Sequence, residues 1–292
     1  MRRLLEKALL RYAHDFPIHK GKFRLVEALW PLACVPGDRL RMGSTRRGGF
    51  EVPCDLDAFI QRQIYFFGDY YLERDLLRVW EKCAAKATTV LDVGANIGIY
   101  SLAAAASNPS ARIHAFEPTS EIAAALREIV RRNRLDNVAV HESGVMDADG
   151  TANLVRCRGA HGANDGMNFV VADPRSDSSP IHAVRLDTFC ANNRIEAIDL
   201  MKIDVQGHEL TVLAGAGALL ADRIGVVFLE LNWNGSPTGG PAGGCVDLLS
   251  GAGYLFSTPA AWPDLRAAGD WLRAQSDVIA CSGPWRERAR WG

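Results

Sequence analysis

The run DVGANIG, from Asp92 to Gly98, is the most informative part of this sequence. It follows the apolar segment TTVL and precedes the helix-prone segment IYSLAAAA, a pattern that predicts a turn between a β-strand and an α-helix. At such a turn, free backbone N–H groups and the positive end of the helix dipole face a ligand. Glycine also lets a cofactor approach the backbone closely. We therefore expect a cofactor site at this turn.

An acidic residue further along the chain indicates the kind of cofactor. Glu117 ends the apolar segment from Ile113 to Phe116, nineteen residues after Gly98. In a βαβ unit of this length the second strand lies beside the first. The Glu117 carboxylate then points into the same crevice, where it can accept hydrogen bonds from a ribose diol. A ligand that contains a nucleoside is therefore favoured.

The glycine spacing separates two such ligands. A nicotinamide dinucleotide normally requires GxGxxG, in which the second glycine admits the pyrophosphate. Here Gly94 and Gly98 bracket residues 95–97, Ala-Asn-Ile, so that this glycine is missing, and Asp92 before the turn suits a positively charged ligand. S-adenosylmethionine has a ribose, an ammonium group and no phosphate, and it is the cofactor that we predict. A tight turn that binds nothing is the structural alternative.

The size and composition are those of a globular protein. The chain has 292 residues, of which 48% are hydrophobic and 23% charged, and its formal net charge is −1. This length allows one large α/β domain with appendages, or two domains. The balanced charge gives no reason to expect a nucleic-acid partner.

The cysteines and the start of the chain bear on its environment. The seven cysteines are scattered without a CxxC pair, which predicts small buried side chains in a reducing, cytoplasmic compartment and argues against structural zinc. No run reaches the ~18 apolar residues that a membrane span needs. The first residues, MRRLLEKALLRYA, predict a basic amphipathic helix without the features of a signal peptide. We expect this helix to pack on the core; weak contact with a membrane surface is the alternative.

The order of the predicted elements indicates the fold class. Residues 1–80 predict a mainly helical extension that covers one side of the sheet, with a loop around GSTRRGGFEVP. Residues 81–292 predict the cofactor-binding domain, whose strands and helices alternate as in an α/β protein with a doubly wound, mostly parallel sheet. The expected strands are 88–92, 112–116, 138–142, 199–204 and 225–231, and the expected helices are 97–107, 119–134, 187–194 and 207–221.

Three further segments follow from composition. The insertion from Gly150 to Arg185 is rich in Gly, Asn, Asp, Ser and Pro, and we expect a partly ordered loop that faces the substrate. The stretch from Asn234 to Gly244 predicts a flexible connection. Near the end of the chain, GYLFS and SDVIACS predict a closing pair of strands.

Acidic residues gather where the fourth and fifth strands end. The fourth ends in LMKIDVQGHEL, which places Lys202 and Asp204 on one side of the strand, followed by His208 and Glu209 at the start of a helix. Because an unpaired acid at the end of a buried strand is costly, Asp204 is a strong functional candidate. The structural alternatives are that Glu209 stabilises the helix N-terminus and that His208 is a surface or capping residue.

The fifth strand ends in FLELN and places Glu230 and Asn232 on a shared face. In a parallel sheet these strands flank the crevice beside the first strand, because the carboxyl ends of the strands share one edge. Asp204, Glu230 and Asn232 would therefore converge near the reactive end of the cofactor.

In this order, DVGANIGIYS, AFEP and the LDTF that precedes MKIDVQGHELTVLAGA resemble the FkbM family of S-adenosylmethionine-dependent methyltransferases. The resemblance covers about residues 65–232. It implies the class I methyltransferase fold, a Rossmann-like seven-stranded sheet with an antiparallel last strand. It also implies O-methylation, commonly of a hydroxyl on a sugar, a glycolipid or a polyketide-type natural product.

The resemblance also implies roles for individual residues. Asp204 and Glu209 match the signature KIDVxGxE, whereas His208 occupies a variable position in it. Asp204 would also border the cofactor. The other implied cofactor contacts are Asp92, Gly94, Ala95, Asn96 and Gly98 along methionine and ribose, Glu117 at the ribose hydroxyls, and Ser143, Gly144, Val145 and Met146 near the adenine.

The chemistry requires alignment of the methyl group with an acceptor, and removal of the acceptor's proton. We hypothesise that Asp204 or His208 is the general base, and that Glu230 and Asn232 orient the acceptor, with Glu209 as a further catalytic candidate. A variant would place Mg²⁺ on Asp204, Glu230 and Asn232, but no metal site is predicted. An NAD-dependent oxidoreductase or epimerase and a non-catalytic cofactor-binding protein are the alternatives.

Overall fold

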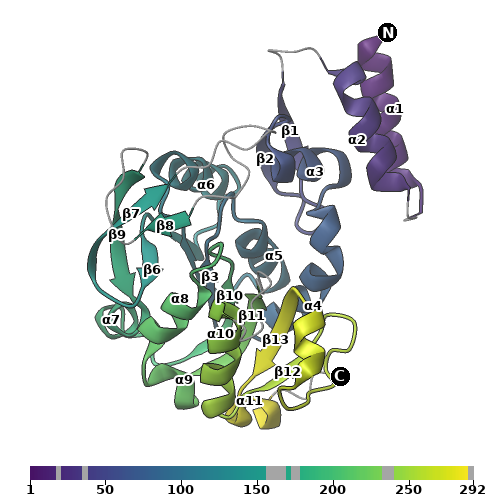
Figure 1. Ribbon diagram of the computed structural model, residues 1–292. Helices are drawn as coiled ribbons and strands as arrows, with labels where there is room; N and C mark the ends of the chain where they lie inside the picture. Colours follow the sequence, from purple (N-terminus) through teal and green to yellow (C-terminus); the bar gives the residue numbers. More distant parts are fainter. Residues whose placement is uncertain (18–20, 35–38, 156–168, 172–177, 232–239, 289–292) are drawn as a thin grey trace. The chain divides into compact units, whose positions relative to one another are not determined.

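The computed structural model describes residues 1–17, 21–34, 39–155, 169–171, 178–231 and 240–288 (Figure 1). The chain divides into two compact units, Met1–Arg74 and a larger one that comprises Asp75–Cys157 and Gly166–Gly292. We describe each unit by itself. Within these ranges no helix combines the length and the apolar character that a membrane crossing requires.

The first unit is built around helix α3. Helix α1 packs against α2 and α3, and α3 packs against the hairpin of β1 and β2. The bounds are α1 (Arg2–Asp15), α2 (Lys22–Ala33), β1 (Leu40–Ser44), β2 (Glu51–Asp55), α3 (Phe59–Phe67) and the short 3₁₀-helix η1 (Tyr71–Glu73). The expected loop at GSTRRGGFEVP is shorter than predicted, because its two ends belong to the antiparallel strands β1 and β2 and only residues 45–50 connect them. Val52 and Cys54 alternate into the core, which anchors the hairpin.

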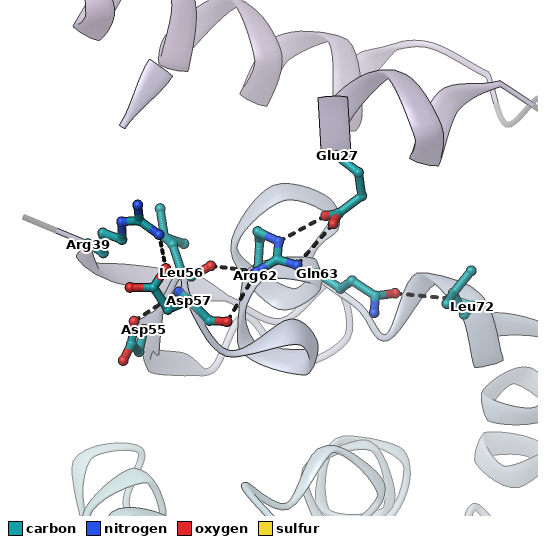
Figure 2. A network of polar contacts seen from close by, with 8 residues as sticks. All are labelled: Glu27, Arg39, Asp55, Leu56, Asp57, Arg62, Gln63 and Leu72. Carbon is teal, nitrogen blue, oxygen red and sulfur yellow. Dashed lines mark hydrogen bonds and ion pairs between the residues drawn. The ribbon is translucent and has the colours of Figure 1, made fainter. Parts of the chain in front are cut away.

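An ion pair ties the elements of this unit together. The guanidinium of Arg62 on α3 is 3% exposed and donates from Nε and Nη2 to both oxygens of Glu27 on α2, each at 2.9 Å (Figure 2). Its Nη1 donates to the backbone oxygen of Leu56 at 2.6 Å, just after β2. The guanidinium also lies over the ring of Trp30, 4.6 Å from the centroid. One buried side chain therefore joins α2, α3 and the end of β2.

The second unit holds a seven-stranded sheet in the order β12-β13-β11-β10-β3-β4-β5. All neighbours are parallel except β13, which runs antiparallel to both β11 and β12. The expected doubly wound sheet with an antiparallel last strand is confirmed. The strands are β3 (Thr89–Val93), β4 (Arg112–Phe116), β5 (Val138–His141), β10 (Ile198–Ile203), β11 (Ile224–Glu230), β12 (Leu255–Ser257) and β13 (Asp277–Cys281).

Helices cover both faces of this sheet. On one face, the buried cluster joins strand residues such as Met201 and Val227 to Phe189 of α7, Val212 of α8 and Leu249 of α10. On the other face, Trp80 of α4 meets α5 and β11, and α6 packs on β5. The helices are α4 (Arg74–Ala84), α5 (Ile99–Ser107), α6 (Ser120–Arg132), α7 (Leu186–Asn192), α8 (Glu209–Ala216), α9 (Leu219–Asp222), α10 (Gly240–Gly251), α11 (Gly283–Arg288) and the 3₁₀-helix η2 (Asp270–Ala274).

The insertion is not the expected loop throughout. Strands β6 (Gly144–Met146), β7 (Gly150–Val155), β8 (Phe169–Val171) and β9 (Ser178–Arg185) form a four-stranded sheet in the order β6-β9-β7-β8. Arg185 fixes its end, because Nε and Nη2 donate to the two oxygens of Asp187 and Nη1 donates to the backbone of Asp147. Residues 156–168 and 172–177 of the insertion lie outside the described residues.

Two smaller expectations are also settled. The stretch 234–244 was expected to be a flexible connection, but its last part is helical, because α10 begins at Gly240. Residues 234–239 lie outside the described residues. Of the seven cysteines, six are buried thiols in the described chain, as expected, and Cys157 lies outside it.

Candidate functional site

The turn from Gly94 to Gly98 uses its own backbone N–H groups. Those of Gly94 and Ala95 both donate to the oxygen of Phe116, and that of Gly98 donates to the oxygen of Ala95. The two between them donate to side chains, Asn96 N–H to Glu117 Oε2 at 3.1 Å and Ile97 N–H to Asn96 Oδ1 at 2.8 Å. The expected free N–H groups are therefore absent along 94–98, and the turn is not a phosphate cradle.

The glycines serve close packing of the protein itself. Gly94 has a φ of 82°, and a Cβ there would lie 2.0 Å from the backbone oxygen of Asp204. Gly98 also has a φ of 82°, and a Cβ there would lie 2.4 Å from Leu126 Cδ1 of α6. The first glycine lets the end of β3 pass the end of β10, and the second seats α5 against α6.

Asp92 lies beneath helix α5. It is 2% exposed, and its Oδ2 accepts hydrogen bonds from the Ser101 backbone N–H at 2.9 Å and from the Ser101 hydroxyl at 2.6 Å. Burial raises the pKa of Asp92 to about 6, against the opposing effect of these bonds and of Lys202. Its described contacts anchor α5 to β3, and it does not line the pocket described next.

A pocket opens where β3, β4 and β10 end, and three groups of residues line it. The first group comes from the turns after β3 and β4, the second from β6 and β7, and the third from the loop after β10. The lining residues are Val93, Gly94, Asn96, Phe116, Glu117, Pro118, Thr119, Ile122, Ser143, Gly144, Val145, Met146, Leu154, Asp204, Val205, Gln206 and His208. Five of the predicted site residues do not line it: Asp92, Ala95, Gly98, Glu209 and Glu230. The other nine meet in this pocket, namely Gly94, Asn96, Glu117, Ser143, Gly144, Val145, Met146, Asp204 and His208.

Glu117 is the buried carboxylate of this pocket. It is 6% exposed; Oε1 accepts the backbone N–H of Thr119 at 2.9 Å, and Oε2 accepts that of Asn96. Burial raises its pKa, while these bonds oppose the rise. The Thr119 side chain also hydrogen-bonds the carboxylate, so that three bonds orient the group. A carboxylate has about four acceptor sites, which leaves capacity for a hydroxyl donor.

The side of the pocket beyond Glu117 is mainly apolar. Phe116 and Ile122 line it from β4 and α6, and Val145 lines it from β6. Leu154 of β7, 2% exposed, also lines it. Sequence reasoning missed Leu154, because it lies in the segment interpreted as a loop; the alternation of apolar residues around it was the available signal.

Asp204, which lines the pocket after β10, belongs to a cluster of polar groups that also includes Glu230 at the end of β11. Lys202 Nζ, 2% exposed, lies 3.2 Å from Asp204 Oδ2 and 5.0 Å from the ring centroid of Tyr100. Gln206 Nε2 donates to Asp204 Oδ1 at 2.9 Å and to Glu230 Oε2 at 3.2 Å. The expected convergence of Asp204 with Glu230 is therefore seen, and Gln206 bridges the two.

The two carboxyl groups have different proton affinities. Burial and the neighbouring Asp204 charge raise the pKa of Glu230 to about 8. Burial also disfavours the charge on Asp204, but Lys202 and the hydrogen bonds from Glu230 and Gln206 outweigh it and lower the pKa of Asp204. At neutral pH the pair therefore holds one proton, on Glu230, hydrogen-bonded to the Asp204 carboxylate.

Helix α8 separates the roles of its two leading residues. His208 is the N-cap residue of α8 and lines the pocket. Glu209 is 3% exposed, and its Oε1 accepts the backbone N–H groups of Val205 at 3.3 Å and Gly207 at 3.0 Å. Its described contacts hold the loop after β10. Asn232 lies outside the described residues, within which no three His, Cys, Asp or Glu side chains are grouped to hold a metal ion.

This arrangement can bind a nucleoside and accept a proton in one pocket. Glu117 and the apolar side chains suit a ribose and a flat base, and Asp204, after the strand on the other side of β3, suits a base or an orienting acceptor.

Comparison with known proteins identifies the chemistry. Residues 92–256 match the family model described as the methyltransferase FkbM domain. The 31-O-demethyl-FK506 methyltransferase FkbM of Streptomyces tacrolimicus is 34% identical over 190 residues, 56% of this chain and 72% of that protein. The 2-O-methyltransferase NoeI of Sinorhizobium fredii is 29% identical over 138 residues, 43% of this chain and 56% of that protein.

Among solved structures, an O-methyltransferase from Bacillus cereus in complex with SAH is 15% identical, with a TM-score of 0.41 over 72% of this chain and 79% of that one. The resemblance seen in the sequence motifs is confirmed by the family model, which covers more than half of the chain, and by the 34% identical relative. The chain belongs to the FkbM family of methyltransferases.

Proposed function

We propose that this chain is an S-adenosylmethionine-dependent O-methyltransferase that methylates a hydroxyl group of a sugar, a glycolipid or a polyketide-type natural product. One observation carries the proposal. A single pocket is lined by the buried, backbone-oriented Glu117 carboxylate, after β4, and by the Asp204 carboxylate, after β10, and these two strands lie on either side of β3. The first suits a ribose, and the second suits the proton that a hydroxyl acceptor must lose.

The turn after β3 supports this cofactor over a dinucleotide. All five backbone N–H groups from Gly94 to Gly98 donate within the protein, so none is available to a pyrophosphate. A sulfonium cofactor needs no such donors, and the carboxylates of Glu117 and Asp204 favour its positive charge. The residues present therefore fit S-adenosylmethionine, and the dinucleotide alternative loses its main support.

In the proposed reaction the cofactor supplies an activated methyl group, and the protein supplies position and proton transfer. Glu117 would hold the ribose hydroxyls, and Phe116, Val145 and Leu154 would enclose the adenine. Asp204 would receive the hydroxyl proton as the acceptor oxygen forms its bond to the methyl carbon. His208 lines the same pocket and would orient the acceptor.

The acceptor class rests on the relatives. Two of them are named as a 31-O-demethyl-FK506 methyltransferase and a 2-O-methyltransferase, and both names describe transfer of a methyl group to oxygen. A base beside the pocket is what a weakly acidic hydroxyl requires. We extend oxygen methylation from these relatives to this chain on that ground.

Calorimetric titration tests the cofactor. We expect S-adenosylhomocysteine to bind and NAD not to bind. Glu117→Gln should weaken S-adenosylhomocysteine binding at least about tenfold, because a hydrogen bond to a charged group contributes about 1.5–3 kcal/mol. Glu142→Gln, a carboxylate removal at an exposed position after β5, should leave the affinity within twofold. Binding of NAD in place of S-adenosylhomocysteine would refute the assignment.

A labelled-methyl assay tests the acceptor. Radioactive S-adenosylmethionine is incubated with the protein and with glycan, glycolipid and polyketide fractions, and the product is identified by mass. An O-methylated product is expected, and a product methylated on nitrogen or carbon would contradict the acceptor class. Asp204→Asn should lower turnover while the affinity for S-adenosylhomocysteine, which lacks the sulfonium charge, is kept. Loss of activity in EDTA would instead support the Mg²⁺ variant of the mechanism.

A further inference from the structure

Gln206 has an unusual backbone conformation at the edge of the pocket. Its φ is 52°, in the left-handed region that few residues other than glycine adopt. The neighbouring backbone is held on both sides, because Glu209 Oε1 accepts the N–H groups of Val205 and Gly207. A long polar side chain in a fixed, strained loop suggests a specific task for that side chain.

The contacts of the side chain indicate the task. An amide nitrogen has two hydrogens, and Gln206 Nε2 donates to the two carboxyl groups at 2.9 Å and 3.2 Å. These carboxyl groups belong to Asp204, which follows β10, and to Glu230, the last residue of the neighbouring strand β11. Only Asp204 and Gln206 line the pocket, so that Glu230 lies behind them.

We propose that Gln206 is a positioning residue that holds Asp204 and Glu230 together as one proton-accepting pair, with Asp204 facing the acceptor hydroxyl. This inference rests on the proposed function. The pair accepts a proton when both carboxyls are ionised. The O–H bond of the acceptor breaks and its proton passes to the pair, while the oxygen's electron pair forms the new bond to the methyl carbon. The S–C bond breaks and leaves its electrons on sulfur.

The surroundings explain why a bridging donor is needed. Two carboxylates at the ends of adjacent strands repel each other, and Asp277 of β13 adds a third negative charge near Glu230. Lys202 acts on both carboxyl groups, and its Nζ lies 3.2 Å from Asp204 Oδ2. At neutral pH the proton on Glu230 holds the pair together. Above the pKa of Glu230 that proton is gone, and Gln206 then offsets the repulsion.

The first test needs no acceptor. The full chain is labelled with ¹³C at the carboxyl groups of Asp and Glu, and the chemical shifts of these groups are followed by NMR as the pH is changed. The signal that is missing in Glu230→Gln is that of the Glu230 carboxyl group. The wild-type pair should titrate near pH 8. Gln206→Met keeps the length of the side chain and removes both donors. The midpoint should then rise by about one pH unit, because the doubly ionised pair loses hydrogen bonds to two charged groups and the singly protonated pair loses such a bond to only one.

The matched control is Arg134→Met. Arg134 has a φ of 53°, is exposed and lies after α6, away from the pocket. This variant shows the effect of a methionine in the same backbone conformation at a distant position. In Arg134→Met the Asp204–Glu230 pair should titrate at the same pH as in the wild type. Gln206→Asn has a shorter amide, and should restore part of the midpoint if the donor is what matters. An unchanged or lowered midpoint in Gln206→Met would overturn the proposal.

The second test uses turnover with the acceptor found by the labelled-methyl assay. Gln206→Met should lower kcat at pH 7.5 about tenfold and move the pH profile upward, with S-adenosylhomocysteine affinity within twofold of the wild type. If Gln206→Met had the same kcat and pH profile as the wild type, the positioning role of Gln206 would be wrong, while the proposed function would be unaffected. Failure of the wild type to bind S-adenosylhomocysteine would instead overturn the proposed function.

Discussion

At the scale of single residues, Gly94 shows how closely the site depends on backbone geometry. Gly94 has a φ of 82°, and a Cβ at this position would collide with the backbone oxygen of Asp204 at 2.0 Å. Gly94→Ala should therefore cost more than about 4 kcal/mol of unfolding free energy, since strain and collision both act. Urea unfolding followed by circular dichroism measures this.

Gly253 provides the matched control for Gly94. Its φ is 83°, and nothing lies within 4 Å of where its Cβ would be. Gly253→Ala should lower the unfolding free energy by about 1–2 kcal/mol, which is the strain of an alanine in the left-handed conformation. Equal losses in the two variants would mean that the approach of Asp204 does not constrain residue 94.

The residues of the site were predictable in different degrees. Glu117 and Asp204 each follow a strongly apolar strand, so their positions at the edge of the sheet could be inferred from the sequence alone. Asp92 has the same signal, yet it satisfies Ser101 beneath α5. The role of Gln206 could not be inferred, because it depends on a positive φ that sequence patterns reveal mainly for glycine.

At the scale of elements, the buried ion pair of the first unit fixes α2 against α3. Arg62→Leu should destabilise this unit by about 3–5 kcal/mol, because it leaves the Glu27 carboxylate without its partner. Hydrogen exchange of the α3 amides, residues 59–67, measures the loss. Glu27→Leu combined with Arg62→Leu should recover much of it, because the uncompensated charge is then removed.

An exposed pair of the same chemistry is the control. Arg131 of α6 lies 2.8 Å from Glu128, but its side chain is 76% exposed. Arg131→Leu should cost far less unfolding free energy than Arg62→Leu, because water screens an exposed ion pair. A cost for Arg62→Leu as small as this would show that the Glu27–Arg62 bonds do not hold the two helices together.

Element prediction succeeded where the signal is local. The central strands have continuous apolar runs, and β3 and β4 were expected within one residue of their observed bounds. The hairpin of β1 and β2 contains Gly43 and Pro53, which weaken a strand signal. Strands β7 and β9 pair across an intervening segment of more than twenty residues, and that pairing is not visible in a local window.

At the scale of the whole molecule, the proton on Glu230 links the site to stability. The pKa of Glu230 rises from an ordinary value of 4.5 to about 8 on folding, so the folded state binds more protons than the unfolded state between these values. The unfolding free energy must therefore fall as pH rises through this window. The pKa of Asp92 is raised to about 6, so that Asp92 also lowers the unfolding free energy as pH rises, but over a lower pH range.

Thermal unfolding from pH 5 to pH 9 tests this linkage. Glu230→Gln removes the titrating group and keeps the shape of the side chain, so its melting temperature relative to the wild type should increase steadily with pH up to about 8. For Asp92→Asn, the melting temperature relative to the wild type should increase at lower pH and become constant above about pH 6. If the difference between Glu230→Gln and the wild type were constant with pH, Glu230 would ionise equally in both states. The carboxyl pair at the site would then not hold a proton at neutral pH, and the general base would have to be Asp204 alone or His208.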